Sequence, residues 1–571
     1  MQKFLRVKMD SKTIVYEDIK EEYALFGGRG LIAKILNDEV NPKCDPLGPE
    51  NKLIVCGGLL NGTMAPNTGR LSIGGKSPLT GGVKEANAGG TAAQMLGKLG
   101  IRAIIVENKP ADNEWFILKI DKNKAELLPA DKYVGMNNYA LTIQLREDFG
   151  AKVSIVSIGC AGERGYRNST VQVTDMEGHP SRAAARGGMG AVMGAKGLKA
   201  IVLDANGSSV ETQYADREKF RAAVKNYIEG IKANPVSGKV FPALGTAALV
   251  NMVNALGALP TYNYSNGRWD KAEQISGEKL VEIQSARGGK SGHICMPGCV
   301  VACSNIYNDE NGNYLTSGFE YETITLNGSN CGIDSLDVIA RIDRLCDDFG
   351  IDTIETGGTI AVCMEAGIIR FGDGEGAIRL IREMIDGTEF GRILGQGTEI
   401  AGKHLGVKRI PTCKGQNVAA YDPRGLKGTG VTYATSPMGA DHTAGNSVGN
   451  PAVNPYKKEG QIELSTNLQV AMATVDSLGL CLMAALGPMA DPVNIGHLCD
   501  MMAGKFGGEW NPDRLFEIGI RTLALEKAFN KAAGFTAKDN RLPGFFYTEV
   551  LPSSGTVFDF TDEELEKAIP F

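Results

Sequence analysis

The stretch "CMPGCVVACS", residues 295–304, holds three cysteines in nine residues: Cys295, Cys299 and Cys303. A spacing of four residues suits one buried face of a helix, where free cysteine packs as a small apolar residue. It also suits thiolate ligands of a metal cluster. On a straight helix, Cys295 and Cys303 would lie about 12 Å apart along the axis, which is too far for one shared cluster.

Pro297 and Gly298 favour the cluster, because proline is poorly tolerated inside a helix and glycine lets the backbone turn. We therefore expect a loop that enters a helix near Val300 and can fold three thiolates around one cluster. The spacing differs from the CxxC pair of zinc sites. It also differs from the CxxxCxxC triad of radical S-adenosylmethionine enzymes.

Length and composition limit the possible classes of protein. The 571 residues predict two to four domains, and a net charge of −6 without a basic block argues against a nucleic-acid partner. We find no run of 18 apolar residues and no apolar leader, so we expect neither a membrane span nor a signal peptide. Twelve cysteines without an obvious pairing pattern suit a reducing cytoplasm. The 73 glycines suggest backbone that closely approaches a large ligand.

The order of the predicted elements indicates an α+β fold. Six apolar runs predict strands, and helical periodicity begins after the linker "GSSVETQ" at 207–213. We expect a β-rich N-terminal domain, residues 1–207, and two mainly helical domains, 208–408 and 409–571. The predicted strands are "KLIVCGG", "RLSIGG", "RAIIVEN", "EWFILKI", "KVSIVSIG" and "KAIVLDA"; the clearest predicted helices are "DREKFRAAVKNYIEGIKA", "SLDVIARIDRLCDDFG" and "EGAIRLIREMID".

Residues 410–451 are rich in turn-forming residues, and the helical pattern resumes from 461 to 534. A loop of this length is uncommon inside a compact domain, so we expect it to have a function.

A cubane iron–sulfur cluster normally needs four cysteine ligands, and the triad supplies three. "DSLGLC", Asp476 to Cys481, resembles "DDFGID", Asp347 to Asp352, since both read Asp-x-x-Gly-(Leu/Ile)-(Cys/Asp). Two related sites would explain the repeated pattern, although chance remains an alternative. The candidates for the fourth ligand are Cys44, Cys56, Cys160, Cys331, Cys346, Cys363, Cys413, Cys481 and Cys499.

These motifs, taken in order, resemble the tungsten-containing aldehyde:ferredoxin oxidoreductases over essentially the whole chain. The resemblance includes the cysteine triad, both Asp-x-x-Gly motifs and the loop around His442. It also includes "GGRGL" at 27–31, "TGRLSIGGKSPLTGGVKEANAGG" at 68–90, "RGGMGAVMGAKGLKAI" at 186–201 and "EYET" at 320–323.

The resemblance implies a tungsten atom held by the dithiolenes of two pterin cofactors, with no protein side chain on the metal. Asp347 and Asp352 would contact one pterin, and Asp476, Leu480 and Cys481 the other. Carboxylates suit this role, because they accept hydrogen bonds from pterin N–H groups. The [4Fe–4S] cluster would take Cys481 as its fourth ligand, and magnesium would bridge the pterin phosphates. Molybdenum in place of tungsten stays open, because the metal ligands belong to the cofactor.

The phosphates would be held by backbone N–H groups in glycine-rich turns, for which "GGTAAQML" and "RGGMGAVMG" are candidates. Plain turn geometry is the alternative for any single glycine. The expected cofactor-binding residues are Arg70, Asn87, Ala88, Gly89, Arg186 and Gly187, with Lys76 as a further candidate.

"GGMGAVMG" also resembles a dinucleotide fingerprint, but Met193 stands where the third glycine is needed. The preceding "SRAAAR" has the composition of a helix, so the required strand–turn–helix context is missing. We therefore expect no nicotinamide site.

Glu322 in "EYET" and His442 in "MGADHTAG" match the catalytic positions of the family, with Glu320 as the alternative carboxylate. A glutamate can activate water and a histidine can hydrogen-bond a carbonyl oxygen. The alternatives are a surface glutamate and a loop histidine. The other histidines, for which we expect surface or structural roles, are His179, His293, His404 and His497.

The chain departs from the family in three places. Its triad is CxxxCxxxC instead of CxxCxxxC, and it lacks a lysine that some relatives carry after His442. The metal-binding Glu-x-x-His between two subunits of the best-known members is "RIDR" here, Arg341 to Arg344. We therefore expect no bridging metal and a hetero-oligomer.

The expected function is oxidation of a small aldehyde to its acid, with electrons leaving through the cluster to ferredoxin or a small iron–sulfur subunit. One alternative is a tungsten enzyme that reduces an aromatic acyl-thioester or a carboxylic acid. Another is a cluster-bearing electron-transfer subunit without tungsten.

Overall fold

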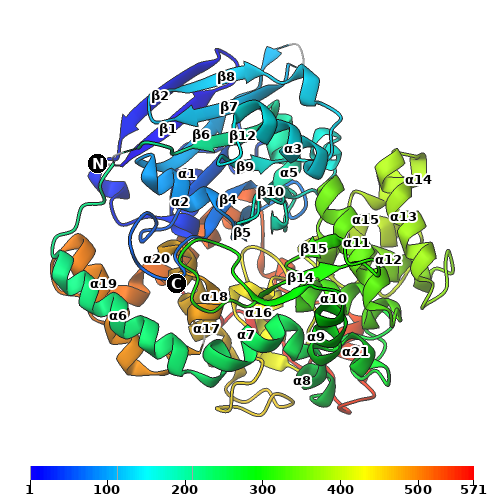
Figure 1. Ribbon diagram of the computed structural model, residues 1–571. Helices are drawn as coiled ribbons and strands as arrows, with labels where there is room; N and C mark the ends of the chain where they lie inside the picture. Colours follow the sequence, from blue (N-terminus) through cyan, green and yellow to red (C-terminus); the bar gives the residue numbers. More distant parts are fainter. Residues whose placement is uncertain (1, 112–113, 209, 486) are drawn as a thin grey trace.

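The structure is a computed structural model that describes residues 2–111, 114–208, 210–485 and 487–571. Two six-stranded sheets form the N-terminal part, and the rest of the chain is mainly helical (Figure 1). This arrangement confirms the α+β class and the β-rich N-terminal region.

The first sheet has the order β2-β1-β6-β3-β4-β5, in which β1 and β6 are parallel and the other pairs antiparallel. Helix α1 (Gly28–Glu39) packs against β3 to β5, and α2 (Ala92–Lys98) packs against β3 and β6. The strands are β1 (Lys3–Lys8), β2 (Thr13–Asp18), β3 (Leu53–Gly57), β4 (Leu71–Lys76), β5 (Val83–Ala88) and β6 (Ile101–Glu107).

The second sheet has the order β11-β10-β9-β12-β7-β8, in which only β12 and β7 are parallel. One apolar core joins the two sheets, including Val55 and Val106 of the first and Leu118 and Ile201 of the second. All six predicted strands are present, because each apolar run is buried between layers. The strands are β7 (Phe116–Asp121), β8 (Ala125–Pro129), β9 (Ser154–Ser157), β10 (Val171–Val173), β11 (Arg182–Ala184) and β12 (Leu198–Asp204).

The prediction of a helix at "SRAAAR" was wrong, because Arg182–Ala184 form strand β11, paired antiparallel with β10. A turn at Gly187 and Gly188, both with positive φ, leads from it into helix α5 (Met189–Ala195). The strand–turn–helix order that we expected to be missing is therefore present. The dinucleotide fingerprint belongs to a parallel βαβ unit, however, whereas β11 is an antiparallel edge strand and Met193 still replaces the third glycine.

The three clearest predicted helices are confirmed as α6 (Arg217–Ala233), α11 (Leu336–Phe349) and α13 (Gly374–Asp386). A small sheet, β13 (Lys290–His293), β14 (Ser304–Asn308) and β15 (Tyr314–Ser317), lies among the helices. The other helices are α3 (Asn138–Phe149), α4 (Cys160–Glu163), α7 (Phe241–Leu244), α8 (Leu249–Ala255), α9 (Gly277–Ala286), α10 (Tyr321–Asn327), α12 (Thr353–Glu365), α14 (Glu389–Leu394), α15 (Thr398–His404), α16 (Lys427–Thr435), α17 (Gln461–Leu478), α18 (Leu482–Ala485), α19 (Pro492–Phe506), α20 (Pro512–Ala533), α21 (Phe545–Thr548) and α22 (Asp562–Leu565).

The 410–451 stretch is more ordered than its composition suggested. It contains the short strands β16 (Thr412–Cys413) and β17 (Gln416–Asn417) and helix α16, whose nine residues are all buried. Its loops therefore run through the interior and bring backbone groups to the centre of the molecule.

One described helical stretch, Val236–Ala255, has the length and mean hydropathy (1.3) of a membrane-crossing helix. It is made of four short segments and turns at Gly245, where φ is 63°. Core helices pass the same test, so this stretch is weak evidence and does not support a membrane assignment.

Candidate active site

The cysteine triad lies in the loop between β13 and β14. The expected turn is present, with φ of 77° at Gly298, but the expected helix near Val300 is not. A second positive φ, 53° at Ala302, leads the chain into β14 instead. The Ala302 N–H donates to the Cys299 sulfur at 3.3 Å, so the loop closes around that thiol.

Asn67 joins this loop to Cys481. Its side-chain oxygen accepts from the Val300 N–H at 3.0 Å, and its amide nitrogen lies 3.3 Å from the Cys299 sulfur. Its backbone donates to the Gly298 carbonyl at 3.0 Å and accepts from the Cys481 N–H at 2.8 Å. One asparagine thus fastens two segments that are far apart in the sequence.

Cys295, Cys303 and Cys481 belong to one buried apolar cluster, and Cys299 packs against it partly exposed. Burial raises the pKa of Cys303 and Cys481, while the neighbouring Cys295 thiol lowers that of Cys299. No three His, Cys, Asp or Glu side chains of the described residues converge tightly enough for a single metal ion. A cubane cluster instead bonds each thiolate to a different iron, so its four sulfurs stand farther apart. Cys295, Cys303 and Cys481 all influence the pKa of Cys299, so the four thiols lie near one another, as the ligands of such a cluster would.

Glu322 and His442 face each other. Glu322 is in the first turn of α10, and His442 begins a short 3₁₀ turn, with 3.3 Å between Glu322 Oε1 and His442 Nε2. Glu322 Oε2 accepts from the Ala420 N–H at 2.8 Å, whereas Oε1 has no hydrogen-bond partner among the described residues. Burial raises the pKa of Glu322, and His442 acts against this rise.

The alternative carboxylate, Glu320, faces elsewhere. It accepts a hydrogen bond from the Thr246 hydroxyl, and its charge acts on Cys303 and Arg182. Glu320 therefore lies on the cysteine side of α10, while Glu322 lies on the histidine side.

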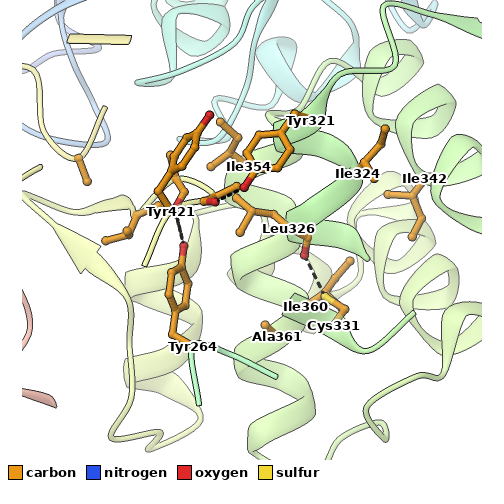
Figure 2. Packing of buried hydrophobic residues seen from close by; sticks show 14 of the residues in the cluster. Tyr264, Tyr321, Ile324, Leu326, Cys331, Ile342, Ile354, Ile360, Ala361 and Tyr421 are labelled. Carbon is orange, nitrogen blue, oxygen red and sulfur yellow. Dashed lines mark hydrogen bonds between the residues drawn. The ribbon is translucent and has the colours of Figure 1, made fainter. Parts of the chain in front are cut away.

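Two buried tyrosines, Tyr264 and Tyr321, hold the segment that supports Glu322, and a third, Tyr421, directly follows that segment (Figure 2). The Tyr264 hydroxyl donates to the carbonyls of residues 418 and 419 at 2.6 and 2.9 Å, and Tyr321 donates to the Ala420 carbonyl at 2.6 Å. The Tyr421 ring lies 6.0 Å from the His442 ring. None of the three was predicted: Tyr321 lies inside "EYET" at the start of α10, and Tyr264 and Tyr421 belong to no motif.

The first Asp-x-x-Gly motif provides two buried carboxylates. Asp352 Oδ1 accepts from the Ile354 N–H at 2.9 Å and caps α12, while Oδ2 lies 3.5 Å from Arg186 Nε. Burial raises the pKa of both Asp347 and Asp352. Arg182, which sequence analysis did not single out, is buried beside Asp347, and its charge opposes the rise there.

The second motif places Asp476 on α17, with Arg29 Nη1 at 3.3 Å. Arg29 also binds Glu526 of α20 through two hydrogen bonds of 2.7 and 2.9 Å. Burial raises the pKa of Asp476, and the nearby Glu85 raises it further. Arg29 belongs to the motif "GGRGL" at 27–31, whereas its partner Glu526 belongs to no motif and was not predicted.

The predicted residues at the end of β5 lie beside the cysteines. Arg70 donates to the Asn87 side chain and, at 3.0 Å, to its carbonyl. A Cβ on Gly89 would lie 3.2 Å from the Cys295 sulfur, so glycine permits this close approach. Ala88 precedes it as the last residue of β5. Leu480 is buried next to Cys481.

Two of the predicted cofactor-binding residues, Lys76 and Arg186, hydrogen-bond backbone carbonyls of the protein. The Lys76 ammonium donates to the carbonyls of Pro42 and Cys44 at 2.6 and 2.7 Å and so holds this turn. Its contact with a cofactor stays a prediction. Arg186 donates to the carbonyls of Ala440 and Asn417 at 2.5 and 2.6 Å and so also anchors the 410–451 stretch.

The site contains several buried polar atoms without hydrogen-bond partners among the described residues. Such atoms are nearly always paired in proteins, so a polar ligand fits here. Guanidinium groups suit phosphates, and carboxylates suit pterin N–H groups. The unpaired atoms are Nε and Nη2 of Arg182, Nε of Arg186, Oδ2 of Asp352, Oε1 of Glu322 and Nδ1 of His442.

The chain is similar to several oxidoreductases over nearly its whole length. The tungsten-containing aldehyde ferredoxin oxidoreductase of Pyrococcus horikoshii is 36% identical over 96% of this chain and 92% of its own. That of Pyrococcus furiosus is 34% identical with the same coverage. The aliphatic sulfonate oxidoreductase, WOR-like subunit, of Pyrococcus furiosus is 28% identical over 94% of this chain and 87% of its own.

The fold matches the active-site complex BamBC of benzoyl coenzyme A reductase, with a TM-score of 0.80 and 21% identity, over 99% of this chain and 92% of that one. The family description of the aldehyde ferredoxin oxidoreductase N-terminal domain matches residues 4–205, and that of domains 2 and 3 matches residues 222–570. The chain therefore belongs to the aldehyde ferredoxin oxidoreductase family of oxidoreductases.

Proposed function

We propose that the protein oxidises aldehydes to carboxylic acids at a tungsten bis-pterin centre and passes the electrons through a [4Fe–4S] cluster. The observation that carries this proposal is the partly buried pair Glu322 and His442, 3.3 Å apart. The similarity to tungsten-containing aldehyde ferredoxin oxidoreductases supports it.

When bound, the tungsten centre would supply the two-electron oxidation. Glu322 would act as the base that takes a proton from water, and Oε1 is the oxygen available for this because Oε2 is bonded to the Ala420 N–H. Its raised pKa moves it toward neutral pH, where a general base works best. His442 would donate a hydrogen bond to the aldehyde oxygen and stabilise the charge that develops there.

The cofactor would lie between the β-rich region and the helical region, since both contribute to the site. Asp347, Asp352 and Asp476 would accept hydrogen bonds from the pterins, and Arg70 and Arg186 would bind their phosphates, whose charge a magnesium ion would help to balance. Molybdenum in place of tungsten would leave these residue roles unchanged.

The electrons would leave through a cluster held by Cys295, Cys299, Cys303 and Cys481. Cys481 is five residues after Asp476, so one segment would contact a pterin and the cluster. We propose ferredoxin or a small iron–sulfur subunit in the cytoplasm as the acceptor.

The test is anaerobic purification followed by analysis for W, Mo, Fe and S and by aldehyde-dependent viologen reduction. We expect tungsten, about four irons per chain, and turnover with aldehydes. Tungsten without aldehyde activity would contradict the proposal and favour reduction of an acyl-thioester or carboxylic acid. Iron without tungsten or molybdenum would favour an electron-transfer subunit.

A further inference from the structure

Lys84 of β5 is fully buried and is not among the residues that would bind the cofactor or act on the substrate. Its Nζ lies 2.9 Å from Asp441 Oδ2 and 3.4 Å from the Met438 carbonyl. Asp441 directly precedes His442. A strand of the first sheet therefore reaches across to the loop that carries the candidate catalytic histidine.

Asp441 connects this ammonium to the histidine. Its Oδ1 accepts from the N–H and the hydroxyl of Thr443, at 3.2 and 2.9 Å, and lies 3.9 Å from His442 Nδ1. The carboxylate thus binds the residue after His442 with one oxygen and Lys84 with the other, so it fixes the backbone on which the imidazole stands.

Gly187 gives Lys84 its path. A Cβ at Gly187 would overlap Lys84 Cγ, and the φ of 86° at this glycine is one that other residues rarely adopt. The absence of a side chain at Gly187 therefore lets the lysine stem reach Asp441.

The buried pair is electrostatically balanced. Burial by itself would raise the pKa of Asp441, but Lys84, followed by Arg186 and His442, holds it well below its usual range. Asp441 is therefore a carboxylate at neutral pH. Because a buried charge without a partner is costly, Lys84 and Arg186 together make a carboxylate beside His442 tolerable.

We propose that Lys84 is a positioning residue for His442, acting through Asp441 to hold the histidine loop and to set the charge beside the imidazole. This inference rests on the proposed role of His442, but it can be tested without aldehyde turnover. The charged and titratable groups that face the histidine site from all sides are Glu322 of α10, Tyr421, Asp441, Lys84 of β5, Arg186 before α5 and Asp352 at the start of α12.

The experiment measures carbethoxylation of individual histidines in the anaerobic holoenzyme as a function of pH, with peptide mass spectrometry. Diethyl pyrocarbonate modifies the neutral imidazole, so the midpoint of each pH–rate curve reports protonation. Only five histidines need to be resolved. His404 is exposed and serves as the internal reference, and the His442 side chain is 17% exposed.

Lys84→Met removes a positive charge and leaves Asp441 ionised beside Arg186, so the imidazolium should gain stability. We expect the midpoint of the His442 pH–rate curve to rise by about one pH unit. At a given pH below the midpoint, the neutral fraction of the imidazole then falls about tenfold. Asp441→Asn removes a negative charge, and the midpoint should move down. The double variant should return close to the wild-type midpoint.

Lys199→Met is the matched control. It also removes a buried ammonium paired with a carboxylate, Glu163, but in the second sheet. It should leave the His442 midpoint unchanged.

Opposite shifts in the two single variants are the signature of charge coupling, because a loop that merely loosens would not reverse the sign of its effect. Shifts in the same direction, or no shift in either variant, would overturn the inference. If the His442→Asn enzyme remained active, the proposed role of His442 in catalysis would be refuted. The coupling of Lys84 to His442 would still be decided by the midpoints of the pH–rate curves.

Discussion

Glu322 Oε1 and His442 Nε2 lie 3.3 Å apart, although one residue is in the first turn of helix α10 and the other begins a 3₁₀ turn after α16. The carboxylate is oriented by the Ala420 N–H, which binds its second oxygen. The imidazole is placed by the turn that Asp441 caps. The two side chains that could act on one substrate are therefore held by separate supports.

Glu322→Gln and His442→Asn should each lower aldehyde turnover by about 10²- to 10⁴-fold while retaining tungsten and iron. The reason is that each would remove a proton-transfer or hydrogen-bonding group without removing a cofactor contact. Steady-state kinetics with metal analysis checks this. If both residues serve one step, the loss of turnover in the double variant should be smaller than the product of the two single losses.

Glu320→Gln is the discriminating control, since Glu320 binds Thr246 instead of facing His442. Near wild-type activity in Glu322→Gln, together with a large loss in Glu320→Gln, would reverse the assignment. Loss of tungsten in either Glu322→Gln or His442→Asn would show that the residue is structural.

Cys481→Ala should lower the iron content and abolish the EPR signal of the reduced cluster, because a cubane cluster needs its fourth thiolate. Cys499→Ala is the matched control: Cys499 is buried in the same apolar cluster, on α19, and its removal should leave the signal intact. A normal signal in Cys481→Ala would make the assignment wrong.

The protein should co-purify with a small iron–sulfur subunit or bind ferredoxin, because one cluster carries one electron and aldehyde oxidation releases two. The two arginines of "RIDR", which we expect to exclude a bridging metal, are engaged within the chain. Arg341 pairs with Glu375, and the Arg344 guanidinium lies 3.3 Å from the centre of the Tyr139 ring. Anaerobic size-exclusion chromatography with mass spectrometry checks this, and a metal-bridged homodimer without another chain would argue against it.

The stability of the protein should rise with pH from about 7 to 10 through Lys196. Burial lowers the pKa of Lys196 to about 7 from its usual 10.5, so in this range the unfolded chain binds the proton and the folded chain does not. Lys196→Met should remove this rise. Thermal unfolding between pH 7 and 10 measures the difference between variant and wild type.

Lys403→Met is the control, because this lysine is on the surface, where its side chain is 67% exposed. Its unfolding temperature should follow the wild type across the range. Lys196 also donates to the carbonyls of Gly48, Pro49 and Asn51. If the unfolding temperatures of Lys196→Met and wild type differ by the same amount at every pH, the lysine acts only through these hydrogen bonds.

The sequence predicted the elements whose signals are local. Six apolar runs became the strands β3, β4, β6, β7, β9 and β12, and three amphipathic segments became α6, α11 and α13. Pro297 and Gly298 correctly indicated a loop within the triad. These predictions succeed because periodicity and turn residues act over a few neighbouring positions.

The local predictions failed where pairing partners decide the conformation. "SRAAAR" has helical composition, but pairing with β10 makes it a strand. Val300 was expected to begin a helix, but Ala302 adopts a positive φ and the chain continues into β14. Tertiary contacts outweigh propensities of a few tenths of a kcal/mol per residue.

Only the tertiary structure decided which distant residues meet. The resemblance named Cys481, Glu322 and His442, but the structure shows how Asn67 joins Cys481 to the triad loop and that Glu322, unlike Glu320, faces His442. Lys84 has no motif of its own, and its role emerges only from its distance to Asp441. The physical reason is that sequence spacing determines which residues share one helix or strand, whereas the approach of side chains from different elements depends on how those elements pack.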